Sequence, residues 1–321
     1  MSNGFRVYLW LGLYLVFRGI FVDITSANQL LELCAERKQE LAQVVAEYEA
    51  FRTNTSVDTV REQMAKTLSV MRASVEKGME DEGELSHIIT GYGRKFRTAS
   101  SEGRLLGDGL FRNVTLYALA VGQYNASLGR IVACPTAGSC GVVPGALLAV
   151  ADELGSSDEE LVEALLVMGG VGIVSAAQGP ISGAEGGCQA ECGVASAMAA
   201  GAVTYLLGGS GEQVFAAASL ALQSHLGLVC DPIASLVEVP CVTRNATSAA
   251  TAIVAVNMAL AGIPAVIPYD ETVVAMKLIG KALPESLRET SQGGLATTPT
   301  GKRLYNEMQE KHRLKMENDP A

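Results

Sequence analysis

The sequence has few aromatic residues and few histidines. Of its 321 residues, 5% are Phe, Tyr or Trp, and only 3 are His. A β-sandwich fills its core with aromatic and β-branched strand residues, so this scarcity argues against an all-β fold. Zinc sites are usually built from His together with Cys, and 3 histidines leave such a site poorly supplied.

Positive charge is also scarce. Lys and Arg number 24 against 34 Asp and Glu, which gives a net charge of -10. The sequence contains no basic stripe that could neutralise phosphates. We therefore expect no nucleic-acid partner.

Small apolar residues and glycine dominate what is present. The hydrophobic fraction is 49%, largely Ala, Val and Leu, and there are 34 Gly. This composition favours close-packed helices, and the length allows a sizeable core. The sequence predicts a mainly α fold: a single large helical domain of Ala- and Gly-rich helices, with Gly and Pro loops at the helix N-termini.

The chain begins with an apolar segment, residues 1–25. Arg6 precedes an apolar stretch that Arg18 interrupts, and this stretch is shorter than the roughly 20 residues that span a membrane. A signal peptide or anchor is one interpretation, but an extension or a misplaced start is favoured. We expect the domain to cover residues 26–304, followed by a charged tail at 305–321.

Helical periodicity and capping boxes predict most elements of this domain. Ser26 and Gln29 form a capping box ahead of one helix at 30–51, and a second box occurs at Ser157 and Glu160. The Gly-rich, charged segment 78–107 predicts a linker or mobile loop. Other helices are expected at 58–77, 108–128, 140–154 and 157–168.

Two segments have no formal charge over nearly the length of a membrane span: 192–211 and 245–269. A membrane transporter is therefore an alternative function. However, polar residues interrupt the second segment, Pro264 and Pro268 break its end, and flanking basic and aromatic residues are largely missing. We expect no membrane association.

The 7 cysteines are an odd number and fit no secreted disulfide framework. Reduced thiols in the cytoplasm are expected. Cys188 and Cys192 are four positions apart, and CxxC runs typical of ferredoxins are absent. The spacing leaves both a metal centre and buried structural thiols open.

Three segments place cysteine, hydroxyl or amide side chains where a Gly or Pro meets the start of a helix. Such helix ends attract anions through free N–H groups and the helix dipole. Together they indicate an anionic ligand in a shared pocket. The segments are "NASLGRIVACPTAGSCGVVPGALLAV" (125–150), "GPISGAEGGCQAECGVASAMAAGAV" (179–203) and "HLGLVCDPIASLVEVPCVTRNATSAATAIVA" (225–255).

These segments, followed by "LRETSQGGLATTPTGKRL" (287–304), resemble the alpha chain of the iron–sulfur-dependent L-serine dehydratases. The resemblance extends from about Ser26 to Leu304 and implies an L-serine ammonia-lyase that forms pyruvate and ammonia. A cysteine desulfidase of the same superfamily is a close alternative. The resemblance implies a 4Fe-4S cluster on Cys188, Cys230 and Cys241, with one open iron and no pyridoxal phosphate. The remaining thiols near the motifs are expected to pack: Cys134, Cys140 and Cys192. For Cys140 and Cys192, a place in the lining of the pocket stays open.

Other site residues are candidates with ordinary structural alternatives. The carboxylate of the substrate is expected to contact hydroxyls and a clamp after Cys241, while a carboxylate or a histidine near the ligands acts as acid or base. A base from another chain remains open. The substrate-binding candidates are Thr136, Ser139, Arg244 and Asn245, and the catalytic candidates are Glu185 or Glu191, and His225.

The resemblance also implies a partner. Single-chain relatives carry an additional domain that corresponds to a separate beta chain, so an alpha–beta heteromer acting on L-serine is expected. The segment "GGLATTPTGKRL" is expected to fold back over the site, since its Gly and Pro residues permit a shaped loop.

Overall fold

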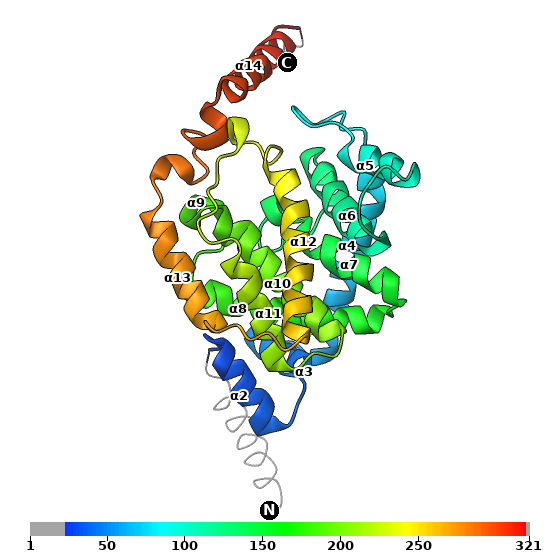
Figure 1. Ribbon diagram of the computed structural model, residues 1–321, viewed down its shortest axis with the longest axis vertical. Helices are drawn as coiled ribbons and strands as arrows, with labels where there is room; N and C mark the ends of the chain where they lie inside the picture. The colour runs from blue at the N-terminus through cyan, green and yellow to red at the C-terminus, as the bar shows by residue number, and fades with distance from the viewer. Residues whose placement is uncertain (1–22, 319–321) are drawn as a thin grey trace, which may run out of the picture.

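The computed structural model describes residues 23–318 and is built from helices (Figure 1). Within that range there is no strand, only an isolated parallel bridge between Cys230 and Arg288. The prediction of a mainly α, single-domain fold is confirmed. The apolar segment expected at residues 1–25 falls almost entirely outside the described residues.

The first half of the chain supplies helices that lie around one side of the bundle. They are α2 (Ala27–Arg37), α3 (Leu41–Thr53), α4 (Val57–Glu80), α5 (Tyr92–Ser101), α6 (Gly109–Ala126), α7 (Val142–Leu154) and α8 (Asp158–Gln178).

The second half supplies the centre and the opposite side. Its helices are α9 (Gly183–Gly186), α10 (Val194–Leu206), α11 (Gly211–Gln223), α12 (Cys241–Leu260), α13 (Tyr269–Ala282) and α14 (Pro299–Asn318). Short turns occur in both halves of the chain: η1 (Ala137–Ser139), η3 (Ile233–Ser235), η4 (Glu285–Leu287) and η5 (Gly294–Thr297) are 3-10 turns, and η2 (Gln189–Gly193) is a π-helical turn. Figure 1 shows α2 and α14 at opposite ends of the molecule.

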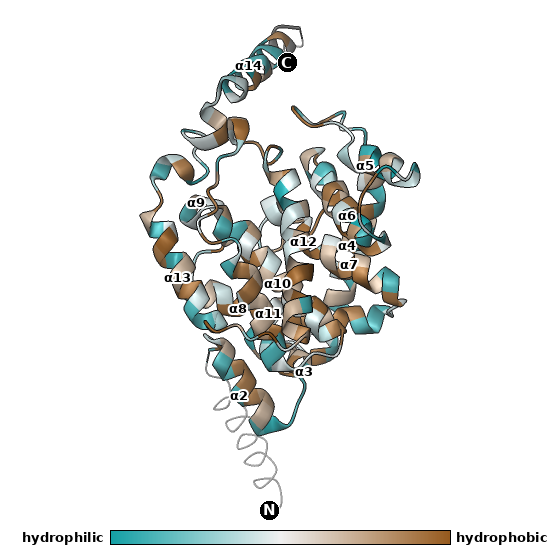
Figure 2. Ribbon diagram, viewed as in Figure 1, coloured by the Kyte–Doolittle hydropathy of each residue, from teal (hydrophilic) through white to brown (hydrophobic). Residues whose placement is uncertain are grey.

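Helix α10 is the centre of the core. Every residue from Val194 to Thr204 is buried, and the helix packs against α7, α8, α11 and α12. Most of these residues are Ala, Gly or Ser, which lose little side-chain entropy and let helices approach closely. Figure 2 shows hydrophobic colours gathered in the central helices and hydrophilic colours on α5.

The helix expected at 30–51 is two helices. Lys38 adopts a left-handed conformation (φ 54°) and ends α2, and the backbone N–H groups of Lys38 and Gln39 both bond to the Cys34 carbonyl. This closure resembles a Schellman cap, which no Gly or Asn announces here. The chain therefore reverses before α3, and both helices can bury an apolar face.

The segment expected to be a linker or mobile loop, residues 78–107, contains α5 and the last turn of α4. Ile89 is 1% exposed, and Gly93 is buried. A Cβ on Gly93 would lie 2.7 Å from the Gly78 carbonyl oxygen, so this glycine lets α5 approach α4 closely. Part of the segment is thus packed structure.

Two helical windows have the length and apolar composition of a membrane span: 137–154 and 158–178. Within the molecule, 78% and 61% of these windows are buried, as in the core helices of many soluble proteins. The segments singled out in the sequence, 192–211 and 245–269, form most of the core helices α10 and α12. The two windows, 137–154 and 158–178, are therefore only weak evidence for a membrane protein.

Candidate active site

The three segments in which a Gly or Pro meets the start of a helix come together at one end of the core. The turn η1 lies against η2, and both contact α12, which begins at Cys241. The sequence anticipates this convergence from the Gly and Pro residues at each helix start. One π-helical turn, η2, leads into α10, and π turns inside helices often mark functional sites.

The three predicted ligand cysteines are all buried and free of disulfides. Cys188 directly precedes η2, Cys230 forms the isolated bridge, and Cys241 is the first residue of α12. Cys188 and Cys230 pack together with Cys192 and Leu228. Cys192, which was expected to pack or to line the pocket, thus lies beside two of the predicted ligands.

The thiols differ in acidity. Burial, together with negative charge on Cys188, raises the pKa of the Cys230 thiol far above its ordinary value and that of the Cys241 thiol to about 12. The pKa of Cys188 is lowered because the Cys192 thiol donates a hydrogen bond to it, although burial opposes this. Buried thiols of this kind become thiolates when a metal ion binds them.

The donor set fits a cluster better than a single ion. Within residues 23–318, no three His, Cys, Asp or Glu residues are close enough to hold one metal ion. A cluster of several irons and sulfides separates its thiolate ligands more widely and prefers Cys ligands. Gly183 leaves room at this point, since a Cβ there would lie 2.7 Å from the Cys230 sulfur.

The segment after α13 folds back onto the ligand loop. Cys230 N–H donates to the Leu287 carbonyl at 2.9 Å, and Glu289 N–H donates to the Cys230 carbonyl at 2.7 Å. Asp231 Oδ2 accepts from the Leu295 N–H at 2.7 Å. Of the segment that was expected to fold back over the site, Leu295 bonds to the residue that follows Cys230.

Arg244 places a partly buried cation beside the thiols. Its Nη2 lies 2.9 Å from Asp231 Oδ1, and its Nη1 donates to the Val229 carbonyl at 2.9 Å. Burial opposes its charge, yet the nearby Cys188 and Asp231 raise its pKa on balance. Arg244 thus holds the ligand loop and gives the site positive charge.

Asn245 and Ser139 are used by the fold itself. Asn245 Oδ1 accepts from the Gly141 N–H at 2.7 Å, and its Nδ2 donates to the carbonyls of Gly138 at 2.7 Å and Cys241 at 2.8 Å. Ser139 is fully buried, and its Oγ donates to the Cys134 carbonyl at 2.9 Å. Both side chains fix the corner between η1 and α12, so a direct bond to substrate would have to displace one of these contacts.

Thr136 and Glu191 form the polar pair of this corner. Thr136 Oγ1 donates to Glu191 Oε1, and Glu191 is 6% exposed. A Cβ on Gly138 would lie 2.4 Å from the same oxygen, so Gly138 makes space for the carboxylate. Burial raises the pKa of Glu191, the Thr136 hydrogen bond opposes this, and Glu289 adds to the increase. A carboxyl with raised proton affinity in a buried site is suited to acid–base work.

The two other predicted catalytic residues lie differently. Glu185, in α9, is exposed. The His225 ring is buried, with Nδ1 2.8 Å from the Ala221 carbonyl and Nε2 2.9 Å from Ser248 Oγ. The carbonyl must accept, so Nδ1 carries the proton and Nε2 accepts from Ser248. Burial lowers the pKa of His225, which keeps this ring neutral within the core.

Two carboxylates near the site were not predicted from the sequence. Glu289 Oε2 and the Cys230 sulfur both lie next to Gly183. The sequence feature that could have indicated Glu289 is its position in the "RETSQGGL" motif. Glu238, between Cys230 and Cys241, is 3% exposed. Its carboxylate accepts from three successive backbone N–H groups, His87 at 2.8 Å, Ile88 at 2.7 Å and Ile89 at 3.0 Å. No local pattern could reveal this, because its partners are backbone amides about 150 positions away in sequence.

Comparisons with known proteins identify the family of the chain. Residues 36–296 match the family model described as "Serine dehydratase alpha chain". The chain is 44% identical over 279 residues to the "Probable L-serine dehydratase, alpha chain" of Bacillus subtilis, covering 87% of this chain and 93% of that one.

Two further relatives differ in length. The "L-serine dehydratase, alpha chain" of Peptoniphilus asaccharolyticus is 38% identical, over 88% of this chain and 97% of that one. The "L-serine dehydratase 1" of Escherichia coli is 38% identical over 84% of this chain but only 61% of that longer protein. By the extent and identity of these matches, the chain belongs to the serine dehydratase alpha chain family.

Proposed function

We propose that the protein is the alpha chain of an L-serine ammonia-lyase. The observation that carries this proposal is that three buried thiols lie in segments that meet at one end of the core, beside a partly buried guanidinium and a buried carboxyl. The names of its relatives point to the same substrate. The reaction removes the α-proton of L-serine and expels the β-hydroxyl as water. The aminoacrylate then tautomerises and is hydrolysed to pyruvate and ammonia.

A 4Fe-4S cluster is the proposed cofactor, held by Cys188, Cys230 and Cys241. Once bound, it would supply a Lewis-acidic iron that makes hydroxide a better leaving group. No pyridoxal phosphate takes part in this scheme. The positive charge of Arg244, close to Cys188, would offset part of the negative charge that three thiolates bring into the core.

Polar residues around the thiols are proposed to provide acid–base catalysis, substrate contacts and positioning. Glu191 is the proposed acid–base residue in preference to Glu185, because Glu191 is buried beside the thiols and Glu185 is exposed. Thr136 fixes the Glu191 carboxyl and offers a hydroxyl near the carboxylate of the substrate. Ser139, Asn245 and His225 act as positioning residues that hold η1, α12 and α11 in place.

We further propose a separate beta chain as partner in an alpha–beta heteromer, located in the cytoplasm. The length comparison supports the partner, since this chain covers almost all of the relatives named alpha chain but 61% of the longer relative. A nucleic-acid partner has no support in a chain of net charge -10.

The test is a product assay on protein prepared without oxygen together with its beta chain. Pyruvate and ammonia should form in equal amounts from L-serine. Sulfide release from L-cysteine at a higher kcat/KM would assign the desulfidase reaction instead. If neither substrate reacts while the cluster is present, the proposed function is wrong.

A further inference from the structure

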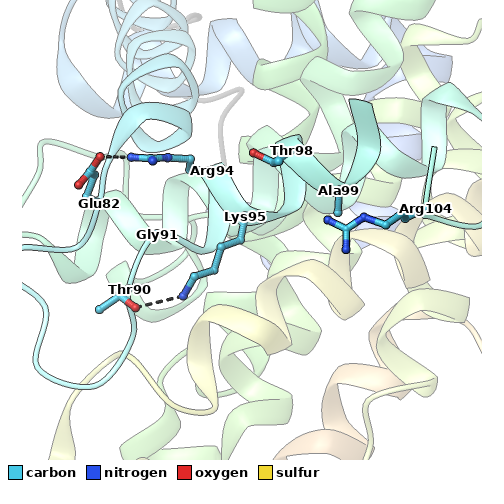
Figure 3. A pocket seen from close by; sticks show the side chains of 8 residues that line it. All are labelled: Glu82, Thr90, Gly91, Arg94, Lys95, Thr98, Ala99 and Arg104. Carbon is cyan, nitrogen blue, oxygen red and sulfur yellow. Dashed lines mark hydrogen bonds and ion pairs between the residues drawn. The ribbon is translucent and has the colours of Figure 1, made fainter. Parts of the chain in front are cut away.

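A pocket is lined in part by Thr90 and Gly91, which directly follow the segment that Glu238 holds. It has a volume of about 630 Å³ and is lined mainly by residues of α5 and of the turn that precedes it (Figure 3). Three cationic side chains line it, Arg94, Lys95 and Arg104, against a single acid, Glu82. This is a local excess of positive charge in a chain whose net charge is -10.

Two of these cations have weak partners. Arg94 pairs with Glu82, and the two side chains are 53% and 62% exposed, respectively. Arg104 pairs with Glu102, which does not line the pocket. Exposed ion pairs of this kind contribute little and are easily exchanged for other partners. Both guanidinium groups can therefore turn toward a ligand at small cost.

Lys95 is the cation that most clearly lacks a counter-charge. Among the described residues, its Nζ bonds to Thr90 Oγ1 at 3.1 Å and lies 5.9 Å from the centre of the Tyr92 ring, and it contacts no carboxylate. Figure 3 shows Arg94 turned toward Glu82 and Lys95 toward Thr90, with Arg104 at the far end. The charges are thus spread along the pocket.

We propose that this pocket binds a small metabolite through an oxyanion, either a carboxylate or a phosphate. Lysine supplies a point charge and arginine a planar pair of donors, which are the usual means of holding both groups. The hydroxyls of Thr90 and Thr98 add polar contacts, and the volume is in the range of small-molecule sites. The site is distinct from the thiol corner and does not rest on the proposed function.

The position of the pocket links it to the thiol corner. Thr90 and Gly91 line it, and His87, Ile88 and Ile89 immediately before them donate to Glu238. Glu238 belongs to the loop that carries Cys230 and Cys241. An anion bound in the pocket would therefore contact residues that directly follow a segment hydrogen-bonded to the loop between Cys230 and Cys241.

The test measures inorganic phosphate binding to the full chain by ³¹P NMR at low ionic strength. We expect a Kd of about 1 mM for the wild type. Lys95→Gln combined with Arg104→Gln should weaken binding by about tenfold or more, equal to about 1.4 kcal/mol. Arg97→Gln is the matched control for Lys95→Gln alone: each removes one positive charge from α5, but Arg97 pairs with Glu80 and does not line the pocket. This control should change the Kd less than about twofold.

Competition identifies the source of the oxyanion. Displacement of phosphate by pyruvate assigns a carboxylate metabolite, and failure to displace it assigns a phosphorylated one. Circular dichroism checks folding, and Lys95→Gln alone replaces the double variant if that one is unfolded. The proposal is overturned if the wild type binds neither anion, or if Arg97→Gln weakens binding as much as Lys95→Gln alone.

Discussion

Helix α10 and the turn just before it are continuous in sequence, yet they bury opposite kinds of side chain. From Val194 to Thr204 the buried residues are mostly Ala, Gly and Val. The preceding turn, from Cys188 to Gly193, buries two thiols, an amide and a carboxyl. Both regions exclude water to the same degree.

The difference lies in what burial does to free energy. Burying Ala or Val is favourable in proportion to the apolar area removed from water. Burying Glu191 opposes folding unless the carboxyl is bonded or protonated, which is why its pKa is raised. Apolar residues in this turn would extend the core, but the chain has thiols and a carboxyl at these positions. Functional sites are commonly less stable than an apolar core would be.

Removing a predicted ligand should have the largest effect. Cys230→Ala should abolish iron binding and the visible chromophore, because two remaining thiolates cannot hold the cluster. Cys134→Ala is the matched control, since this thiol is equally buried but packs against Met168, with its sulfur 3.4 Å from Sδ. Iron content and the absorption spectrum measure both. Equal iron content in the two variants would show that the thiols of the turn are no different from those of the core.

The next largest effect is expected for Glu191→Gln. Loss of an acid–base group lowers kcat by about 10²–10⁴-fold. Because burial raises the pKa of Glu191, its ionised form opposes folding at pH values above that pKa. The neutral amide should therefore leave the free energy of unfolding unchanged or higher, a gain that disappears at low pH. Kinetics and urea unfolding at two pH values measure this, and Glu185→Gln should remain near wild-type activity.

Asn245→Ala tests the polar scaffold of the corner. It removes three hydrogen bonds and leaves the buried Gly141 N–H without its acceptor. The free energy of unfolding should fall by about 2–4 kcal/mol. Thr251→Ala, on the same helix, loses only a hydroxyl bond to Thr247 and should change stability by less than about 0.5 kcal/mol. Similar losses for the two variants in urea unfolding would contradict the role given to Asn245.

The smallest effects are expected for two adjacent glycines of α8. A Cβ on Gly170 would lie 2.7 Å from a Val45 methyl, whereas a Cβ on Gly169 would meet nothing within 4 Å. Gly170→Ala should destabilise by about 1 kcal/mol through overpacking, and Gly169→Ala should stabilise by about 0.5–1 kcal/mol through helix propensity. Thermal unfolding gives the sign of each change. If both shift in the same direction, the close α3–α8 contact is wrong.

The fold was largely predictable because its signals are local. Capping boxes at Ser26 and Ser157 form as expected, and helix starts follow the Gly and Pro breakers. The turn at Lys38 was not predictable, because a lysine in the left-handed conformation has no sequence signature. Helix α5 was missed because its packing depends on a close approach between Gly93 and Gly78, distant in sequence.

The site was predictable in composition more than in geometry. The motifs indicated which segments converge, and η1, η2 and α12 do meet. They could not indicate that Asn245 is fully engaged with backbone groups. Nor could they separate Glu191 from Glu185, because the two carboxylates differ in burial, which only the fold shows.

The central claim is that thiols from three segments hold one iron–sulfur cluster. Iron and acid-labile sulfide content of protein purified without oxygen tests it most directly. The account predicts about four irons and four sulfides per chain, with brown colour. Colourless, metal-free protein that still converts L-serine to pyruvate would contradict it.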